Sequence, residues 1–437
     1  MLLMAVVGVM PATSQERRAM TVTELFDLVE SNSKTLQETK TSVEFAQKGI
    51  EAARAQRLPD VNASLSASYN GNVVVMDRDF TNAKGFSSPH FGNSFALEAQ
   101  QVVYAGGAIN AGIRMAELQR DMAATGHRMT SNAQRFMALG QYLDLFKIQN
   151  RMQVYEQNIA LTSRLIDNIR AKQEQGMALK NDVTRYELQM ETLRLGLRKL
   201  QDQQAILNHQ LCNTLGVEQD VVIVPSEELI VNSEKFATAK DTSFSTLQSS
   251  LNQAMIYSPQ IEQSQLSTRM AEQQLKLAKS ELLPKLAVVA ADNFNGPFTY
   301  DIPPIDKNIN YWYVGVGLRY NLSSLFKSKK KVSQAETGVQ QSLDQQKVVA
   351  ENLDNQVQQA WTLYQQTYAD LDTQRKSVQL ARQNYQVVND RYLNQLALIT
   401  DMLDASNIRL NAELQEVDAR INIVYAYYKM KYIAGTI

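Results

Sequence analysis

The sequence contains one arrangement twice. Up to the first strand, the first half matches the second at a shift of 225 positions, so that Pro59 falls on Pro284. Beyond a loop that is longer in the first copy the shift is 219, and Asp182 falls on Asp401. A duplication of this length indicates two copies of one architectural unit. Each copy has a helix, two short strands, a very long helix and a further helix, in that order.

Bulk properties of the 437-residue chain exclude several classes of protein. The net charge of −1 gives no reason to expect a nucleic-acid partner. The single cysteine, Cys212, excludes an internal disulfide framework and a zinc cluster of thiolates. No window approaches the roughly eighteen apolar residues of a transmembrane helix. His90, His127 and His209 lie in unrelated segments, so we expect no metal site and no other cofactor.

The first nineteen residues resemble a secretory signal. Leu2 to Met10 form an apolar run, and Pro-Ala-Thr-Ser follows it as a cleavage region would. No cysteine follows that region, so we expect no lipid anchor at a mature N-terminus. Residues 1–19 are therefore expected to direct export.

Two long tracts without proline predict long helices. No proline lies between Gly107 and Val224, and none follows Pro304. The predicted helices cover about 22–57, 106–172 and 180–216 in the first copy, and 252–282, 327–393 and 399–434 in the second. The longest helix of the first copy would be roughly 100 Å long and its two partners roughly 55 Å each, at 1.5 Å per residue. Two short helices laid end to end therefore match one long helix.

Apolar residues in these tracts recur at alternating spacings of three and four. One stripe is Leu145, Ile148, Met152, Tyr155, Ile159, Thr162, Ile166 and Ile169, and another is Val183, Tyr186, Met190, Leu193, Leu197, Leu200, Gln204, Leu207 and Leu211. This spacing is typical of coiled-coil seams. A solvated helical bundle would show the same seams. A rod of this length would expose much of its apolar seam as a monomer, so we expect several copies of the chain to assemble.

Two hairpins, 60–104 and 285–322, contain four segments that alternate as strands. Val61 to Tyr69 alternates with Asn and Ser, and Trp312 to Leu322 alternates with Gly, Arg and Asn. Each run has about ten to twelve residues, which is the length of a tilted strand that crosses a bilayer. Asp292, on the otherwise apolar face of strand 286–294, counts against a membrane location. A soluble hairpin packed on a helix would also alternate.

Four strands are too few to close a barrel, and lipid does not tolerate an open sheet edge. If these strands cross a membrane, several chains must contribute them to one wall. Three copies would supply twelve strands, an even number within the known range of such barrels. The loops 72–92 and 297–310, rich in Asp, Gly, Pro and Asn, would then face the outside of the cell.

Several motifs in the expected order give the chain a resemblance to the outer-membrane efflux channels typified by TolC. The resemblance extends from about Met20 to Ile437. It is carried by Gln101-Val-Val-Tyr-Ala-Gly-Gly107, Ala53-Arg-Ala-Gln-Arg-Leu-Pro59, Leu283-Pro284, Tyr392-Leu-Asn-Gln-Leu-Ala-Leu-Ile-Thr-Asp-Met-Leu-Asp-Ala405 and Tyr428-Lys-Met-Lys-Tyr-Ile-Ala-Gly435. Val102 replaces a proline of the family's motif at the passage from strand to helix.

The resemblance implies a mainly α fold with a small β part: tandem helical hairpins and four transmembrane strands per chain. Three chains would form a 12-stranded β-barrel and a 12-helix α-barrel. The expected segments are 1–19 signal-like, 20–216 first repeat, 217–250 linker or equatorial region, and 251–437 second repeat. The implied function is passive exit across the outer membrane, without enzyme activity, for substrates that an inner-membrane pump and a periplasmic adaptor deliver.

The resemblance also implies roles for particular residues. Asp401, Asp404 and Asp182 match acidic residues that constrict the lumen near the periplasmic tip. For Asp401 a plain role at a helix start remains open, because an acid there complements the helix dipole. The adaptor would dock on the turns Gly176-Met177-Ala178-Leu179 and Gln395-Leu396-Ala397-Leu398, of which the second lacks the glycine of the first. Gln101, Tyr104, Gly106, Gly107, Pro59 and Pro284 match the junction between barrel and tunnel.

The expected partners are two further copies of the chain, the adaptor, the inner-membrane transporter and outer-membrane lipid. The chain would lie in the bacterial outer membrane and extend into the periplasm. The alternative is a soluble periplasmic coiled-coil scaffold or adaptor without a pore. Four alternating strands of bilayer length would then be a coincidence.

Overall fold

The computed structural model describes residues 16–226, 246–299, 301 and 303–437. The chain folds as two compact units. Unit 1 comprises Met1–Thr41, Thr125–Glu262 and Val348–Ile437, and unit 2 comprises Ser42–Ala124 and Gln263–Lys347.

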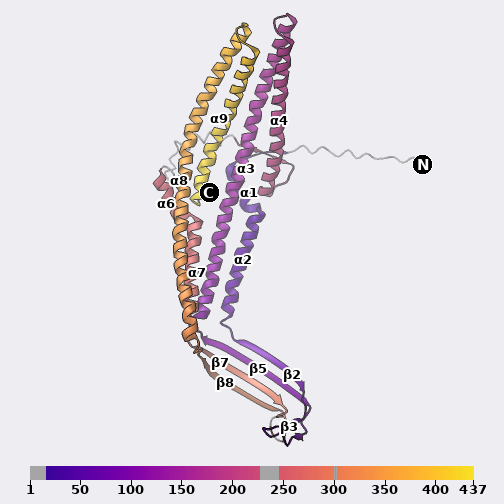
Figure 1. Ribbon diagram of the computed structural model, residues 1–437, viewed down its shortest axis with the longest axis vertical. Helices are drawn as coiled ribbons and strands as arrows, with labels where there is room; N and C mark the ends of the chain where they lie inside the picture. The colour runs from indigo at the N-terminus through magenta and orange to yellow at the C-terminus, as the bar shows by residue number, and fades with distance from the viewer. Residues whose placement is uncertain (1–15, 227–245, 300, 302) are drawn as a thin grey trace, which may run out of the picture. The chain divides into compact units, whose positions relative to one another are not determined.

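Helices dominate the described residues, as predicted. The first copy has α1 (Val22–Asn32), α2 (Lys34–Ala55), α3 (Ala108–Glu174) and α4 (Lys180–Leu215), and the second has α6 (Leu247–Tyr257), α7 (Pro259–Ser280), α8 (Ser324–Leu393) and α9 (Ile399–Ile433) (Figure 1). The four long helices begin and end within three residues of their predicted bounds.

The predicted helices 22–57 and 252–282 are each broken once, which the sequence reading did not foresee. The breaks lie at Ser33 and Ser258, which the repeat shift of 225 places at equivalent positions. Both serines have extended backbone, with ψ of 120°. Their N–H groups donate to the carbonyls of Val29 (3.1 Å) and Ala254 (3.0 Å), so each serine satisfies one carbonyl of the last turn that it ends.

A small parallel sheet lies in unit 1. It pairs β1 (Glu16–Met20) with β6 (Val221–Pro225). The expected signal-like segment 1–19 therefore ends inside β1, while residues 1–15 lie outside the described residues. The predicted linker 217–250 contains β6 and the start of α6, and its residues 227–245 also lie outside the described part.

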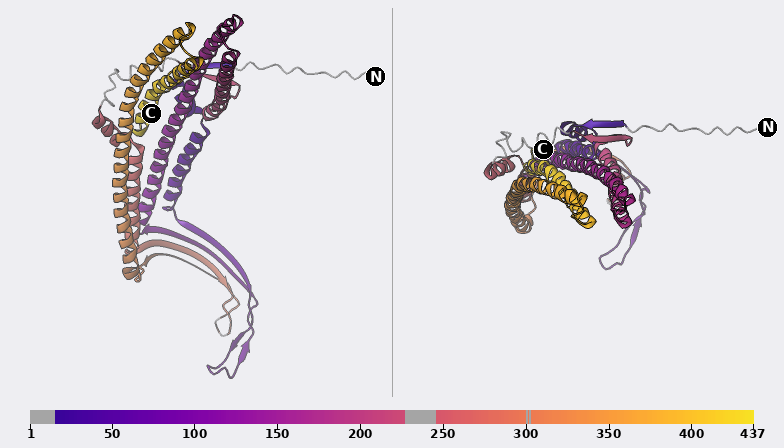
Figure 2. Two further views of the ribbon diagram at one scale, coloured as in Figure 1. Left: turned by 45° about the horizontal axis from the view of Figure 1, so that its top comes forward. Right: turned by 90° about the horizontal axis from the view of Figure 1, so that it is seen from above.

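The main sheet lies in unit 2 and is antiparallel. It contains β2 (Asp60–Tyr69), β5 (Phe91–Tyr104), β7 (Lys285–Gly296) and β8 (Ile309–Arg319) in the order β2-β5-β7-β8. Figure 2 shows these strands side by side as one curved sheet. A short hairpin of β3 (Val73–Val75) and β4 (Lys84–Phe86) lies in the predicted loop 72–92.

Strand β8 ends earlier than the predicted strand 312–322. Asn321 starts a turn there, because its Oδ1 accepts from the N–H (3.2 Å) and the hydroxyl (2.8 Å) of Ser323. Tyr320 and Leu322 therefore lie outside the sheet, between β8 and α8.

The pairing register is the same in both copies. Asp60 pairs with Gln100 in the first hairpin, and Lys285 pairs with Arg319 in the second. Shifts of 225 on the first strand and 219 on the second convert one pair into the other, and they do so for all ten pairs of β2 and β5. The duplication read from the sequence is thus confirmed at the level of individual strand pairs.

The predicted coiled-coil seams are buried. Every residue of the two stripes in the first copy is buried or half-buried. A further core of unit 1 joins α1, α3, α4, α9 and β6 through Leu25, Tyr142, Leu211, Val424 and Ile223. The hydroxyl of Tyr142 donates to the Met20 carbonyl at 2.6 Å and accepts from the Ser226 N–H at 2.9 Å, which fastens the end of β1 to that core.

Candidate functional site

The main sheet has one mainly apolar face and one mixed face that holds most of the polar residues. Cross-strand partners share a face, so the register sorts the side chains. The mainly apolar face carries Val61, Ala63, Leu65, Ala67, Tyr69, Phe91, Asn93, Phe95, Leu97, Ala99, Gln101, Leu286, Val288, Ala290, Asp292, Phe294, Asn310, Trp312, Val314, Val316 and Leu318. The mixed face carries Asp60, Asn62, Ser64, Ser66, Ser68, Gly92, Ser94, Ala96, Glu98, Gln100, Lys285, Ala287, Val289, Ala291, Asn293, Asn295, Ile309, Tyr311, Tyr313, Gly315, Gly317 and Arg319.

Asp292 is the charged residue on the mainly apolar face, as the sequence indicated. It lies on the apolar face between Leu97 and Trp312, its register partners in β5 and β8. Its Oδ1 is buried and has no hydrogen-bond partner among the described residues.

The predicted barrel-tunnel junction residues gather where the strands meet the helices. Pro59 directly precedes β2 and Pro284 directly precedes β7, where a missing N–H costs no ladder bond. Gln101 joins the end of β5 to the segment before β2, since its Nε2 donates to the Arg57 carbonyl at 2.8 Å. The register of β5 on β7 shifts between Val102 and Tyr104, so a bulge lies at this end of the strand.

The two junction glycines are required for different reasons. Gly106 has a φ of +63°, and a Cβ on it would lie 2.8 Å from the Ser280 carbonyl and 2.9 Å from the Leu283 Cβ. A side chain at Gly106 would therefore collide with the end of α7. Gly107 has a φ of +86° and faces open space, so only its backbone conformation favours glycine.

The two predicted docking turns, which connect α3 to α4 and α8 to α9 at the top of Figure 1, have the same backbone hydrogen-bond pattern. Gly176 N–H donates to Gln173 (2.9 Å) and Met177 N–H to Lys172 (2.8 Å), which is a Schellman helix end. In the other turn, Gln395 N–H donates to Tyr392 (3.1 Å) and Leu396 N–H to Arg391 (2.8 Å). Gln395 adopts the left-handed conformation of Gly176, so the missing glycine did not change the turn.

Both turns present apolar side chains to solvent. Met177 and Leu179 are 49% and 69% exposed, and Leu396 and Leu398 are 69% and 70% exposed. The alanine between them, Ala178 or Ala397, is half-buried in each turn. Each turn thus exposes two large apolar side chains at a helix tip.

Two of the three candidate gate aspartates cap their own helices. Asp182 Oδ2 accepts from the Leu179 N–H and Asp401 Oδ2 from the Leu398 N–H, each at 3.1 Å. Asp404 lies nearly one turn further along α9 and is exposed. It has no hydrogen bond or ion pair among the described residues, so its carboxylate is free for another role.

A compact core holds the tips of the two hairpins together within unit 1. It contains Ile166 and Ile169 of α3, Val183, Tyr186 and Met190 of α4, and Ile399 and Met402 of α9. Lys172 Nζ donates to the Leu393 carbonyl at 3.2 Å and lies over the Tyr392 ring. Burial raises the pKa of Tyr186, whose hydroxyl has no partner among the described residues.

A buried polar network below this core was not foreseen from the sequence. Arg409 of α9 is 7% exposed, donates to Asn158 Oδ1 of α3 at 2.9 Å and stacks 3.8 Å from the ring centroid of Tyr385 of α8. Asn158 donates to Glu413 (3.3 Å), and Arg382 donates to the other oxygen of Glu413 (3.0 Å). The network joins three helices. The sequence indicated this network only through Arg409, an arginine at a core position of α9.

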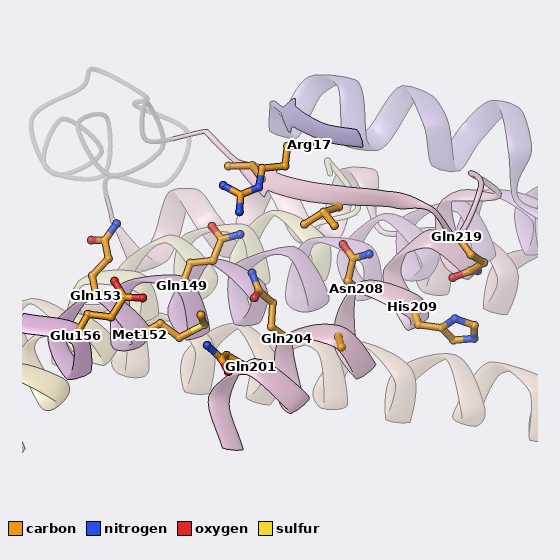
Figure 3. A pocket seen from close by; sticks show the side chains of 13 residues that line it. Arg17, Gln149, Met152, Gln153, Glu156, Gln201, Gln204, Asn208, His209 and Gln219 are labelled. Atoms are coloured by element: carbon orange, nitrogen blue, oxygen red, sulfur yellow. The ribbon is translucent and has the colours of Figure 1, made fainter. Parts of the chain in front are cut away.

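A polar groove of about 760 Å³ lies beside the β1–β6 sheet in unit 1 (Figure 3). Its lining is rich in amides, including Gln149, Gln153, Gln201, Gln204 and Gln219, with Arg17 above them. Glu156 and His209 lie at opposite ends of the view in Figure 3 and point away from one another. The groove thus brings together no carboxylate–histidine pair for acid–base chemistry.

The described residues provide neither a membrane-spanning helix nor a metal site. No helix there combines the length and the apolar content needed to cross a membrane. Within the same residues, no three side chains of His, Cys, Asp and Glu converge on a position where they could hold a metal ion.

Comparison with known proteins agrees with this geometry. A family model described as outer membrane efflux protein matches residues 25–217 and 250–436. No curated protein matches the chain. Among solved structures, the outer membrane protein VceC of Vibrio cholerae has a TM-score of 0.74 at 15% identity, with 95% of this chain and 96% of that chain covered.

Two further structures have the same fold. CusC, whose structures describe transmembrane channel formation, has a TM-score of 0.80 at 15% identity, with 94% of this chain and 91% of that chain covered. The open-state MtrE outer membrane channel of Neisseria gonorrhoeae has a TM-score of 0.71 at 11% identity, with 95% and 88% covered.

Proposed function

The chain belongs to the outer membrane efflux protein family, and on this premise we propose that three copies form a passive exit duct. Membership places the chain in the outer membrane, with its helical part extending into the periplasm. The duct performs no chemical reaction. It takes substrates that an inner-membrane transporter and a periplasmic adaptor deliver.

The two-faced sheet with two open edges is the observation that carries the proposal. Its strands of 10 to 14 residues have bilayer length, and one face is mainly apolar, with Asp292 as its charged residue and Asn93, Gln101 and Asn310 as its amides. Among the residues that the structure describes, β2 and β8 each pair on one side only. Because lipid does not tolerate open edges, other copies must cover them, and three copies give a closed wall of twelve strands.

The gate of the proposed duct lies at the periplasmic tips. Asp404 is the strongest of the three candidates, because it is exposed and caps no helix. Three copies would place three Asp404 carboxylates around the axis, where like charges attract cations. Asp401 and Asp182 each accept a hydrogen bond from a backbone N–H through one carboxylate oxygen. Their main role is therefore to hold the tip turns in shape, and their negative charge in the lumen is secondary.

The adaptor docks on the two tip turns in this proposal. Support comes from their matched form: a left-handed residue, a half-buried alanine and two exposed apolar side chains in each. Six such turns in a trimer would offer a repeated apolar surface to a helical partner.

Membrane fractionation with detergent extraction tests this function. We expect the full-length protein in the outer-membrane fraction, running as a trimer that heating dissociates. Recovery as a soluble monomer without affinity for lipid would remove the duct and leave the periplasmic scaffold.

A further inference from the structure

The two copies of the repeat differ in chemistry where the last strand leads into the long helix. The first copy passes from β5 into α3 through Gly106-Gly107, and α3 begins at Ala108. The shift of 219 places Leu325-Phe326-Lys327 at these three positions. α8 begins at Ser324, three residues before the equivalent of Ala108. The second copy therefore has an additional helical turn with large side chains where the first copy has a glycine turn.

The additional turn presents apolar side chains to solvent. Leu322, just before α8, is 69% exposed, and Phe326 is 65% exposed. Leu325 between them is exposed as well. Large apolar side chains grouped in this way on a surface indicate a contact with an apolar partner or a membrane.

Four exposed lysines follow this turn on α8: Lys327, Lys329, Lys330 and Lys331. Lys331 pairs at 3.0 Å with Glu281, which directly follows α7, and the Ser328 hydroxyl donates to the same carboxylate at 2.9 Å. The other three, called the free lysines below, have no ion pair within the described part of the chain. Their equivalents in the first copy are uncharged: Ala108, Asn110 and Ala111. The uncompensated positive charge is thus a feature of the second copy alone.

The apolar and basic side chains share one face of the helix. Ser324 and Ser328 are buried and mark the face of α8 that is turned toward the protein. With 3.6 residues per turn, Phe326 lies nearly opposite both serines. Lys329 and Lys330 are its neighbours at i+3 and i+4 on the helix surface. The outward face therefore combines an aromatic ring with two ammonium groups.

This face lies at the end of the main sheet where the strands meet the helices. β8 ends at Arg319, beside Lys285, the first residue of β7, and α8 begins five residues further on (Figure 1). In the proposed duct the strands cross the outer membrane and the helices extend into the periplasm. This end of the sheet then lies at the inner leaflet, where phospholipid phosphates meet the acyl chains.

We infer that the first two turns of α8 anchor the chain to that leaflet, with the free lysines bound to phospholipid phosphates and Phe326 set among the acyl chains. The inference rests on the proposed function and adds a lipid contact made by the second copy alone. Lysine suits this position, because its apolar stem can run along the bilayer edge while the ammonium group reaches a phosphate. An apolar face flanked by lysines is typical of helices at a membrane interface. Anionic lipid should bind best, since each lysine near an anionic surface contributes roughly fivefold.

Fluorescence quenching in vesicles tests whether the turn contacts lipid. Trp312→Phe and Trp361→Phe leave Phe326→Trp as the single reporter in full-length trimers, reconstituted in phosphatidylcholine with brominated acyl chains. We expect the reporter to lose at least about half of its fluorescence, because an aromatic ring at an interface lies near the acyl chains. Leu343→Trp in the same background is the matched control. It lies roughly 25 Å further along α8 and should lose less than about a tenth.

Competition between lipids tests the lysines. Phosphatidylglycerol without bromine should displace brominated phosphatidylcholine from the reporter at least about fivefold better than plain phosphatidylcholine does. Replacing the free lysines together should reduce this preference to less than about twofold. The variant is Lys327→Gln, Lys329→Gln and Lys330→Gln. The control variant removes the same charge from exposed lysines of unit 1 and should keep the preference: Lys40→Gln, Lys199→Gln and Lys376→Gln.

The outcomes separate the anchor from the function beneath it. An unquenched reporter at position 326, in vesicles that contain the trimer, would overturn the anchor and leave the duct intact. A preference for phosphatidylglycerol that survives loss of the free lysines would overturn it too. A lysine variant whose trimer dissociates at a lower temperature, with its lipid preference unchanged, would assign the face to a contact between copies instead. If the unaltered chain forms no trimer and does not enter vesicles, the proposed function fails and the anchor fails with it.

Discussion

Gly176 and Gln395 have the same left-handed backbone, with φ of 75° and 62°, at the equivalent position of the two helical tips. Both end their helix with the same pair of hydrogen bonds. Glycine adopts this conformation freely, whereas glutamine pays a steric cost of about 1–2 kcal/mol. The two tips therefore have the same backbone conformation, and the tip at Gln395 is strained in it.

Gln395→Gly should stabilise its tip. Relief of the left-handed strain exceeds the added flexibility of the unfolded chain, so we expect a gain of about 0.5–1 kcal/mol. Gly176→Ala should cost about 1 kcal/mol for the reverse reason. Thermal unfolding of the purified protein measures both. The control is Ala397→Gly, where φ is not positive and glycine should destabilise. Equal losses for Gln395→Gly and Ala397→Gly would refute the strain.

The aspartates at the tip should separate into two groups. Asp404→Ala should leave thermal stability unchanged and raise single-channel conductance, because it removes lumen charge without removing a cap. Asp182→Ala and Asp401→Ala should each cost about 0.5–1 kcal/mol through loss of the cap. With Asp401→Ala added to Asp404→Ala, conductance should rise further. Unchanged conductance and unchanged cation block in the double variant would contradict the gate.

Two buried tyrosines should respond in opposite ways to loss of the hydroxyl. Tyr142→Phe removes the hydrogen bond to the Met20 carbonyl and the acceptor of the Ser226 N–H. It should lower the free energy of unfolding by about 1–2 kcal/mol. Tyr186→Phe removes a buried hydroxyl without a partner among the described residues and should be neutral or gain up to about 1 kcal/mol. Denaturant unfolding at pH 7 compares them. An equal loss in both variants would show that hydrogen bonding does not distinguish the two sites.

The same tyrosines predict an alkaline limit to stability. Burial raises the pKa of Tyr142 from 10.0 to about 12 and raises that of Tyr186 as well. A raised pKa means that the folded state needs the protonated form, so this stability is present below pH 10 and is lost as pH rises toward 12. Unfolding free energy measured from pH 9 to 12 should fall less steeply in Tyr186→Phe. A slope identical to that of the unaltered protein would exclude Tyr186 as a source.

Arg409 should couple the second hairpin to α3. Arg409→Met removes the bond to Asn158 and the stacking on Tyr385, so we expect a loss of about 1–3 kcal/mol. A double-mutant cycle with Asn158→Ala should show an interaction of about 1 kcal/mol. The control is Arg382→Met, whose exposed side chain should matter by less than about 1 kcal/mol. Strict additivity of the two changes would show that Arg409 and Asn158 act separately.

Periodic features of the fold could be predicted from the sequence because they depend on spacing alone. The seam from Val183 to Leu211 is buried as its alternating spacing required. The two faces of β2 follow from alternation in the same way. The duplication then fixed the order of the elements in both copies.

Local breaks were harder to predict because backbone hydrogen bonds decide them. The break at Ser258 had a signal, since Pro259 favours the first position of a helix. Its equivalent at Ser33 is followed by Lys34 and had none. The matching conformation of Gln395 and Gly176 could not be predicted, because a left-handed helix end is normally recognised by a glycine. The hydrogen bonds at this helix end hold a non-glycine residue in the left-handed region. The pairing of Arg409 with Asn158 depends on how α9 faces α3, which spacing within one helix does not specify.

Recording from a planar lipid bilayer tests the central claim most directly, namely that strands from several copies form one pore wall. Purified trimer added to one side should produce discrete conductance steps of uniform size. A trimer that binds lipid and produces no steps, with the gate aspartates present or removed, would contradict the account.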